Sequence, residues 1–487
     1  MSTTAEQPCA IIRISLFISP LWQSMIRMRI FSSRKLFSSA AWQIRMALWG
    51  GAVLVGVVAI LFAEMADGAN HIFAAIVHDY PLAALVLSPL GLMAITWLTR
   101  HYFQGAEGSG IPQTLAALDP RTKGEMQNRI LSVRVAVGKI LMATLGLLSG
   151  ASIGREGPTV HIGAAIMFSL GRWVKYPPHY LQRALILSGG AAGIAAAFNT
   201  PLAGVVFAIE EISRSFEENT SGVMLTGVIF AGMTALILAG NYTYFGSTDV
   251  LFTYGADWIA IPVCGVAGGL LGGIFSQILI SGSRRLVPFY RAHPLWLAGL
   301  CGLAVAVIGL LSGNLTYGTG YAEAQQIISE GEQIAPAYPF LKMLATIASY
   351  LSGIPGGIFA PSLAAGAGLG ADLATLMPGI SATAIIILGM AAYFTGVVQT
   401  PITAFVIVME MTDNQEMLLP LMATAFIANG VSRLVCPTPI YRALATAFLE
   451  VTAPKVKKEP PLPADFRPDL EEESGTEPEQ RRTGRQD

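Results

Sequence analysis

The sequence predicts an all-α polytopic membrane protein made of two repeated halves, and two observations carry this prediction. Hydrophobic residues make up 53% of the 487-residue chain, charged residues make up only 13%, and the mean hydropathy is +0.57. Soluble domains carry about 25% charged residues, so this composition excludes a soluble protein. Several motifs that contain glycine and proline also occur twice in the same order, which indicates an internal repeat.

The N-terminal segment, residues 1–40, is predicted to be basic and cytoplasmic. Residues 27–45 include five basic side chains and no acidic one, and the positive-inside rule places such segments in the cytoplasm. Two spans are then expected, at about 47–63 and 82–98. The connection between them, residues 64–79, has no Lys or Arg and is expected to be an external loop.

The remaining connections alternate in charge and support one consistent topology for the transmembrane domain, residues 41–450. Basic residues cluster near 121–129, 172–183 and 284–291, whereas 241–257 and 314–339 have acids and no Lys or Arg. Many apolar stretches are too short or too broken to span a bilayer alone. Residues 451–487 are polar and predicted to form a disordered cytoplasmic tail.

Two sets of motifs define the repeat. NTPLA at 199–203 matches QTPIT at 399–403, and each is followed at the same distance by a glutamate, Glu210 or Glu410. GREGP at 154–158 corresponds to GIFAP at 357–361, and we also match GIP at 110–112 with GIP at 353–355.

The repeats are expected at about 50–240 and 257–434, with a final helix at about 440–450. Interrupted segments in corresponding places predict a transport site at the interface of the halves. Whether the halves are inverted depends on the number of spans between them.

Glu156 lies in the most informative break. A charge at that depth in a bilayer costs several kcal/mol unless it is paired or faces water. Glycines permit irregular backbone there, and Pro158 suits the first turn of a new helix. Amides at a helix start bind anions, so a carboxylate beside them can compete with a bound anion.

These motifs resemble those of a known family. GSGIP at 108–112, GREGP at 154–158, GIFAP at 357–361, AAAFNTPLAG at 195–204 and EMTDN at 410–414 are similar to motifs of the CLC family of chloride channels and chloride/proton antiporters. The likeness extends from about residue 42 to residue 447. It implies a CLC-like fold of two inverted repeats with short tilted and broken helices, and a homodimer with one pathway per subunit.

The resemblance also implies which residues bind chloride. These are Gly108, Ser109, Arg155, Gly157, Ile358, Phe359 and Tyr441. From the residues alone, Ser109 is more often a helix N-cap, which does not exclude contact with an anion, and Tyr441 is more often an interfacial anchor. Ile358 and Phe359 have apolar side chains that pack, so only their backbone amides would face the anion.

Two glutamates are implied to carry the mechanism. Glu156 would be the gate and the external proton glutamate, with a salt bridge as the alternative role. Glu211 would transfer protons on the internal side, as in the coupled antiporters of the family. The repeat pairs Glu210 with Glu410, so we expect both of these to be structural. Lys139 must be paired or face water, and His161 is expected to be a packed polar residue.

We therefore predict a secondary active antiporter that exchanges chloride for protons. It would lie in the cytoplasmic inner membrane as a multi-pass protein with both termini in the cytoplasm. The alternatives are an uncoupled chloride channel of the same fold and, from another class, a cation/proton antiporter. No enzyme motif, cofactor, metal site or nucleic-acid partner is predicted.

Overall fold

The computed structural model describes residues 39–122, 124–173, 179–213, 218–240, 243–248, 250, 255–330 and 335–452. Within these ranges the regular structure is helical, apart from two isolated β-bridges. Most of the predicted N-terminal segment and of the predicted tail lies outside the described residues.

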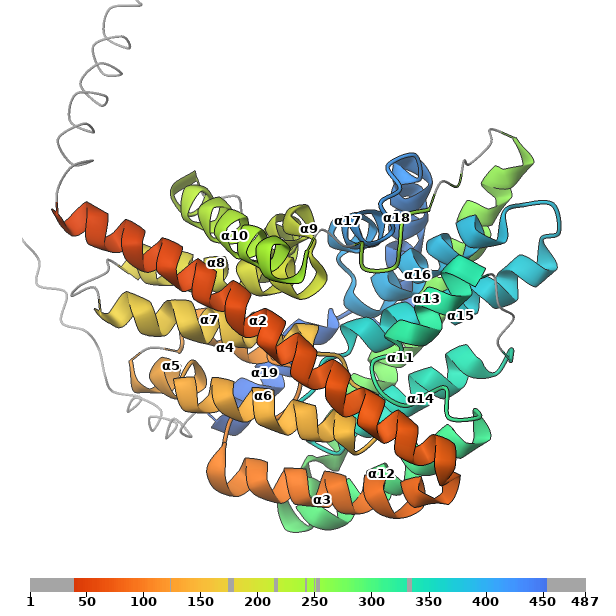
Figure 1. Ribbon diagram of the computed structural model, residues 1–487, viewed down its shortest axis with the longest axis horizontal. Coiled ribbons are helices and arrows are strands. Elements are labelled where there is room, and N and C mark those ends of the chain that lie inside the picture. Colours follow the sequence, from red (N-terminus) through yellow and green to blue (C-terminus); the bar gives the residue numbers. More distant parts are fainter. Residues whose placement is uncertain are drawn as a thin grey trace, which may run out of the picture.

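Long and short helices alternate along the chain (Figure 1). The first half contains α2 (Ser39–Asp79), η1 (Pro81–Ala83), α3 (Ala84–Tyr102), α4 (Ile111–Leu118), α5 (Glu125–Ile130), α6 (Val133–Leu148), α7 (Glu156–Trp173), α8 (His179–Phe198), α9 (Pro201–Phe207), the π-helical η2 (Ala208–Ser213) and α10 (Glu218–Ala239). The second half contains η3 (Ala256–Ile259), α11 (Ala260–Ala292), α12 (Pro294–Leu311), α13 (Tyr321–Glu330), α14 (Tyr338–Leu351), α15 (Phe359–Leu376), α16 (Ala382–Val398), α17 (Pro401–Thr412), α18 (Leu418–Val435) and α19 (Ile440–Thr452).

Eight helical segments in the described residues are long and apolar enough to cross a membrane, which confirms the polytopic prediction. One expectation was wrong. Residues 64–79 continue α2 instead of forming a loop. Residues 64–79 contain no proline. The helix that begins in the preceding apolar run can therefore continue through them.

The same packing order occurs twice. α7 packs on α8, and α10 packs on both α2 and α8; likewise α15 packs on α16, and α18 packs on both α11 and α16. Figure 1 shows α7, α8 and α10 on one side of the molecule and α15, α16 and α18 on the other, with α2 running diagonally across the view. α9 and α17 are in contact between the two sides. The boundaries of the two repeats stay a prediction.

One pairing within the repeat needs correction. The loops that carry the GIP segments at 110–112 and 353–355 lie side by side, and the contacts of two buried lysines described below show that they are not equivalent places of the two halves. Gly108 N–H donates to the Ile354 carbonyl at 3.2 Å, and Gly356 N–H donates to the Gly108 carbonyl at 3.2 Å. The match in letters is coincidental.

A pair of buried lysines identifies the true counterpart. Lys139 Nζ donates to the carbonyls of Ala106 at 2.8 Å and Gly108 at 3.1 Å. Lys342 Nζ donates to the carbonyls of Thr316 at 3.0 Å and Gly318 at 2.9 Å. The two lysines precede Gly154 and Gly357 by the same number of residues, so the loop before α13 is the counterpart of the loop before α4.

Candidate functional site

Three helix starts meet at one buried place between the halves. α4 begins after Gly110, α7 begins at Glu156, and α15 begins at Phe359. Gly154 and Gly357 exchange backbone hydrogen bonds of 2.8 and 2.7 Å, which hold the starts of α7 and α15 together. The first amides of a helix have no partner within it and lie at the positive end of its dipole. This convergence is a structural basis for binding an anion.

Glycines make the convergence sterically feasible. Gly108 and Gly110 adopt φ values of +67° and +103°, which side chains disfavour. A Cβ on Gly157 would lie 3.3 Å from the Cα of Gly357 and would collide with the Ser109 hydroxyl. Because Gly157 has no side chain, the backbone at the start of α7 can lie close to the starts of α4 and α15.

Glu156 points into this convergence. Its side chain is fully buried, and neither carboxylate oxygen has a hydrogen-bond partner within the described ranges. The backbone amide of Ala360 and the Arg155 guanidinium are among the groups that favour its charged form. Burial favours a neutral carboxyl whereas amides and cations favour a carboxylate, so this side chain has opposing influences on its protonation.

The hydroxyls of Ser109 and Tyr441 lie beside each other at the same place. Both are buried, and neither oxygen forms a hydrogen bond to the described parts of the chain. Tyr441 is brought here by α19, which packs on α4 as Figure 1 shows. The late tyrosine and the early serine are therefore neighbours, as the resemblance implied.

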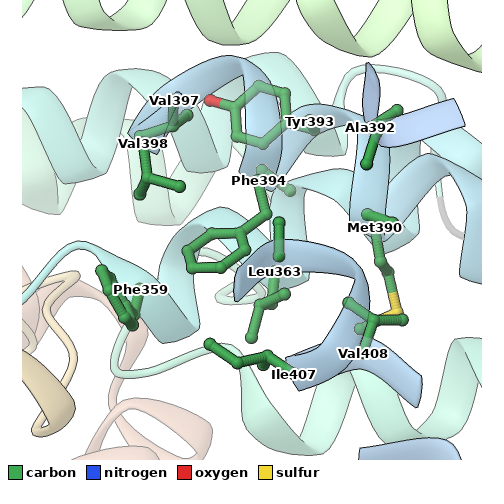
Figure 2. Close-up of a cluster of buried hydrophobic side chains, with 14 of the residues drawn as sticks. Phe359, Leu363, Met390, Ala392, Tyr393, Phe394, Val397, Val398, Ile407 and Val408 are labelled. Atoms are coloured by element: carbon green, nitrogen blue, oxygen red, sulfur yellow. The ribbon is translucent and has the colours of Figure 1, made fainter. Parts of the chain in front are cut away.

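The side chains of Ile358 and Phe359 are buried in the apolar core, as the sequence predicts. The Phe359 ring packs edge-to-face on Phe394, with 4.8 Å between centroids, and tilts against Tyr441 at 5.8 Å. Figure 2 shows Phe359 at the edge of this cluster, with Phe394 and Leu363 nearby. The packing fixes the direction of the first amides of α15.

Glu210 and Glu410 are structural, which confirms that prediction. Glu210 accepts hydrogen bonds from the amides of Ile402 at 3.1 Å and Thr403 at 2.6 Å. Glu410 accepts the equivalent bonds from the amides of Leu202 at 3.1 Å and Ala203 at 2.7 Å. Each half thus caps the short helix of the other half.

Glu211 lies apart from this exchange. It belongs to the π-helical segment η2, is 1% exposed, and is close enough to Tyr441 to act on it electrostatically. π-Helical turns are rare in proteins, but those that occur are frequently found at functional sites. Glu156 also acts on Tyr441, so the tyrosine is within electrostatic range of both candidate proton carriers.

Lys139 holds the loop before α4 through its carbonyls, and the Cβ of His161 packs against Gly110 at the end of that loop. Lys139 is paired with backbone carbonyls, and His161 Nε2 lies 3.0 Å from the Ile130 carbonyl. His161 is a packed polar residue, as expected. Both residues support the backbone around Ser109 from outside its own loop.

Two polar residues near the site carried no signal in the sequence. The Tyr350 hydroxyl lies beside the backbone amide of Ser109, and Asp67 forms an ion pair with Arg155. Both contacts join residues far apart in the chain. No local motif marks either of them.

Comparisons with known proteins identify the family. The model of the voltage gated chloride channel family matches residues 90–433. The chain is 32% identical over 413 residues to the H(+)/Cl(-) exchange transporter ClcA of Salmonella typhimurium, covering 79% of this chain and 83% of that one. It is 30% identical over 434 residues to ClcA of Yersinia pestis, covering 82% and 86%.

Solved structures agree with this assignment. A slow cyanobacterial Cl−/H+ antiporter superposes with a TM-score of 0.72 at 26% identity, covering 84% of this chain and 99% of that one. A CLC-type fluoride/proton antiporter superposes with a TM-score of 0.71 at 24% identity, which shows a shared fold. The chain therefore belongs to the CLC family and is an all-helical, multi-span membrane protein with the CLC fold. It is a transport protein and not an enzyme.

Proposed function

We propose that this protein is a secondary active antiporter that exchanges chloride for protons. The observation that carries the proposal is the fully buried carboxylate of Glu156 at three converging helix starts. An ionised Glu156 occupies the place of an anion, and a protonated Glu156 releases that place to chloride. Proton binding and chloride passage are thereby linked at one side chain.

The chemistry of the site favours an anion over a cation. Helix-start amides from residues 155–157 and 358–359, together with the hydroxyls of Ser109 and Tyr441, present hydrogens to a bound ion. Partial charges of this kind hold a halide loosely enough to release it. The amides of Gly108 and Ser109 are engaged with the Ile354 carbonyl and the Tyr350 hydroxyl. A cation/proton antiporter would need several carboxylates or carbonyl oxygens directed at the same place.

Coupling is supported by the second buried carboxylate. Glu211 and Glu156 both lie within electrostatic range of Tyr441, so a second candidate proton carrier, distinct from the gate, lies near the candidate anion site. Glu211 is buried and takes no part in the reciprocal caps of Glu210 and Glu410, which favours a role in proton coupling over an uncoupled channel. Relatives named as H(+)/Cl(-) exchange transporters add support.

The test is a flux measurement in liposomes that contain the purified protein. We expect an outward chloride gradient to drive protons inward, against their own gradient. Chloride flux without proton movement would support the channel instead. Fluoride replaces chloride in a parallel measurement, because one similar fold belongs to a fluoride/proton antiporter; faster coupled flux with fluoride would change the assigned anion.

We also propose the organisation in which this exchange operates. A cytoplasmic segment, residues 1–40, precedes the transmembrane domain, residues 41–450, and a cytoplasmic tail, residues 451–487, follows it. The protein is a homodimer in the cytoplasmic membrane with one pathway per subunit. Basic residues near 121–129 and 284–291 and their scarcity in the alternate connections support this orientation.

A further inference from the structure

Arg155 is tied to a different helix from the one that it precedes. Its Nη1 donates to Asp67 Oδ2 at 2.6 Å and to the Ala63 carbonyl at 3.0 Å, and both acceptors belong to α2. The Arg155 side chain is 8% exposed whereas the Asp67 side chain is 48% exposed. A buried guanidinium beside Glu156 is thus balanced by a carboxylate that reaches solvent.

The position of this ion pair links it to the gate. Ala63 and Asp67 are one helical turn apart and therefore share a face of α2, which packs on α7. Arg155 immediately precedes Glu156, the first residue of α7. The contact between α2 and Arg155 therefore holds the backbone at the start of the gating helix.

Two charged groups in the described part of the chain act on Glu156, Arg155 beside it and Asp67 from α2. Tyr441 from α19 lies within electrostatic range of Glu156 but is a neutral phenol. The carboxylates that act on Arg155 are those of Asp67 and Glu156. Asp67 is the acidic group in this set that reaches solvent, so it offsets the Arg155 charge where external chloride would arrive.

We propose that Asp67 is a positioning and tuning residue of the external gate, acting through Arg155 to set the proton and chloride dependence of exchange. This inference rests on the proposed antiporter function. With Asp67 ionised, much of the Arg155 charge is neutralised, so Glu156 is protonated more easily and chloride is attracted less strongly. Loss of the Asp67 charge makes Glu156 harder to protonate and attracts chloride more strongly.

The test compares Asp67→Asn with wild type in proteoliposomes. We expect the external pH of half-maximal exchange to move toward acid by on the order of one pH unit, because an uncompensated cation stabilises the ionised gate. The apparent KM for external chloride falls, and exchange at neutral pH slows. Asp67→Glu, which keeps the charge, should restore the wild-type pH profile.

Glu64→Gln is the matched control, because Glu64 is an exposed acid on the same helix. It removes the same charge close by and should leave the profile unchanged. If Asp67→Asn lowers only the amount of folded protein, while pH profile and KM stay at wild-type values, Asp67 is merely structural and the inference is wrong. Asp67→Ser repeats the measurement with a smaller side chain if the asparagine variant does not fold.

The two proposals fail in different ways. A wild-type protein that moves chloride without protons contradicts the antiporter function. A wild-type protein with coupled exchange, together with an Asp67→Asn variant whose pH profile and KM are unchanged, contradicts only the role of Asp67.

Discussion

Glu156 and Phe359 are equivalent residues of the two halves with different chemistry. Each is the first residue of its helix, and the glycines two residues before them exchange backbone hydrogen bonds. The scaffold is therefore shared, whereas one half presents a carboxylate and the other a packed ring. A symmetric backbone brings helix-start amides from both halves to one place, and only one half adds a carboxylate there.

Replacing Glu156 with alanine tests the gate at the scale of one residue. Chloride flux should continue in Glu156→Ala, because the helix-start amides remain while the competing carboxylate is gone. Proton flux driven by chloride should fall to the level of protein-free liposomes. Simultaneous recording of both ions decides the outcome, and proton coupling retained at the wild-type ratio would exclude Glu156 as the gate.

Replacing Glu211 with glutamine tests the inner proton carrier. The neutral amide keeps the size of the side chain but cannot carry a proton, so proton transport should be lost while chloride still moves. Glu210→Gln is the matched control, because the Glu210 carboxylate caps α17 and the amide oxygen of glutamine can still accept from one of the two N–H groups. Equal loss of coupling in both variants would speak against a specific role for Glu211.

At the scale of elements, local signals were predictable from the sequence and distant contacts were not. The broken segments around Ser109, Glu156 and Phe359 are marked by glycine and proline, which act within a few residues. The Tyr350 contact with Ser109 depends on how α14 ends beside the α4 loop, which no local pattern states. The repeated GIP letters were also misleading, because the equivalent loops are identified only by the distant contacts of Lys139 and Lys342.

The reciprocal caps provide an element-scale prediction. Glu410→Ala removes two hydrogen bonds from the start of α9, and Glu210→Ala removes two from the start of α17. Each should lower the free energy of unfolding by about 1 to 2 kcal/mol, as the loss of other helix caps does. Thermal unfolding in detergent measures the change. Unaltered stability in both variants would show that water replaces the carboxylates without cost.

For the whole molecule, the resemblance to a family supplied the expected fold and the roles of the site residues, which composition alone does not predict. Composition and charge predict a multi-span helical protein, and the described structure contains eight candidate spans. The absence of Lys and Arg favoured a loop at residues 64–79, although Ala66, Ala69, Phe73 and Val77 recur at helical spacing and are buried in the extension of α2. The orientation of the spans in the membrane still rests on the distribution of Lys and Arg.

That orientation can be measured at two exposed positions. Asp79 ends α2, and Arg291 lies in the last turn of α11. With both termini in the cytoplasm, Asp79→Cys should react in intact cells with a maleimide that cannot cross membranes, whereas Arg291→Cys should react only after the cells are opened. Wild type is the control for its own thiols, of which Cys264 and Cys436 are buried and Cys301 is partly exposed. The reverse labelling pattern would invert the topology and place Asp67 on the cytoplasmic side, where it could not tune an external gate.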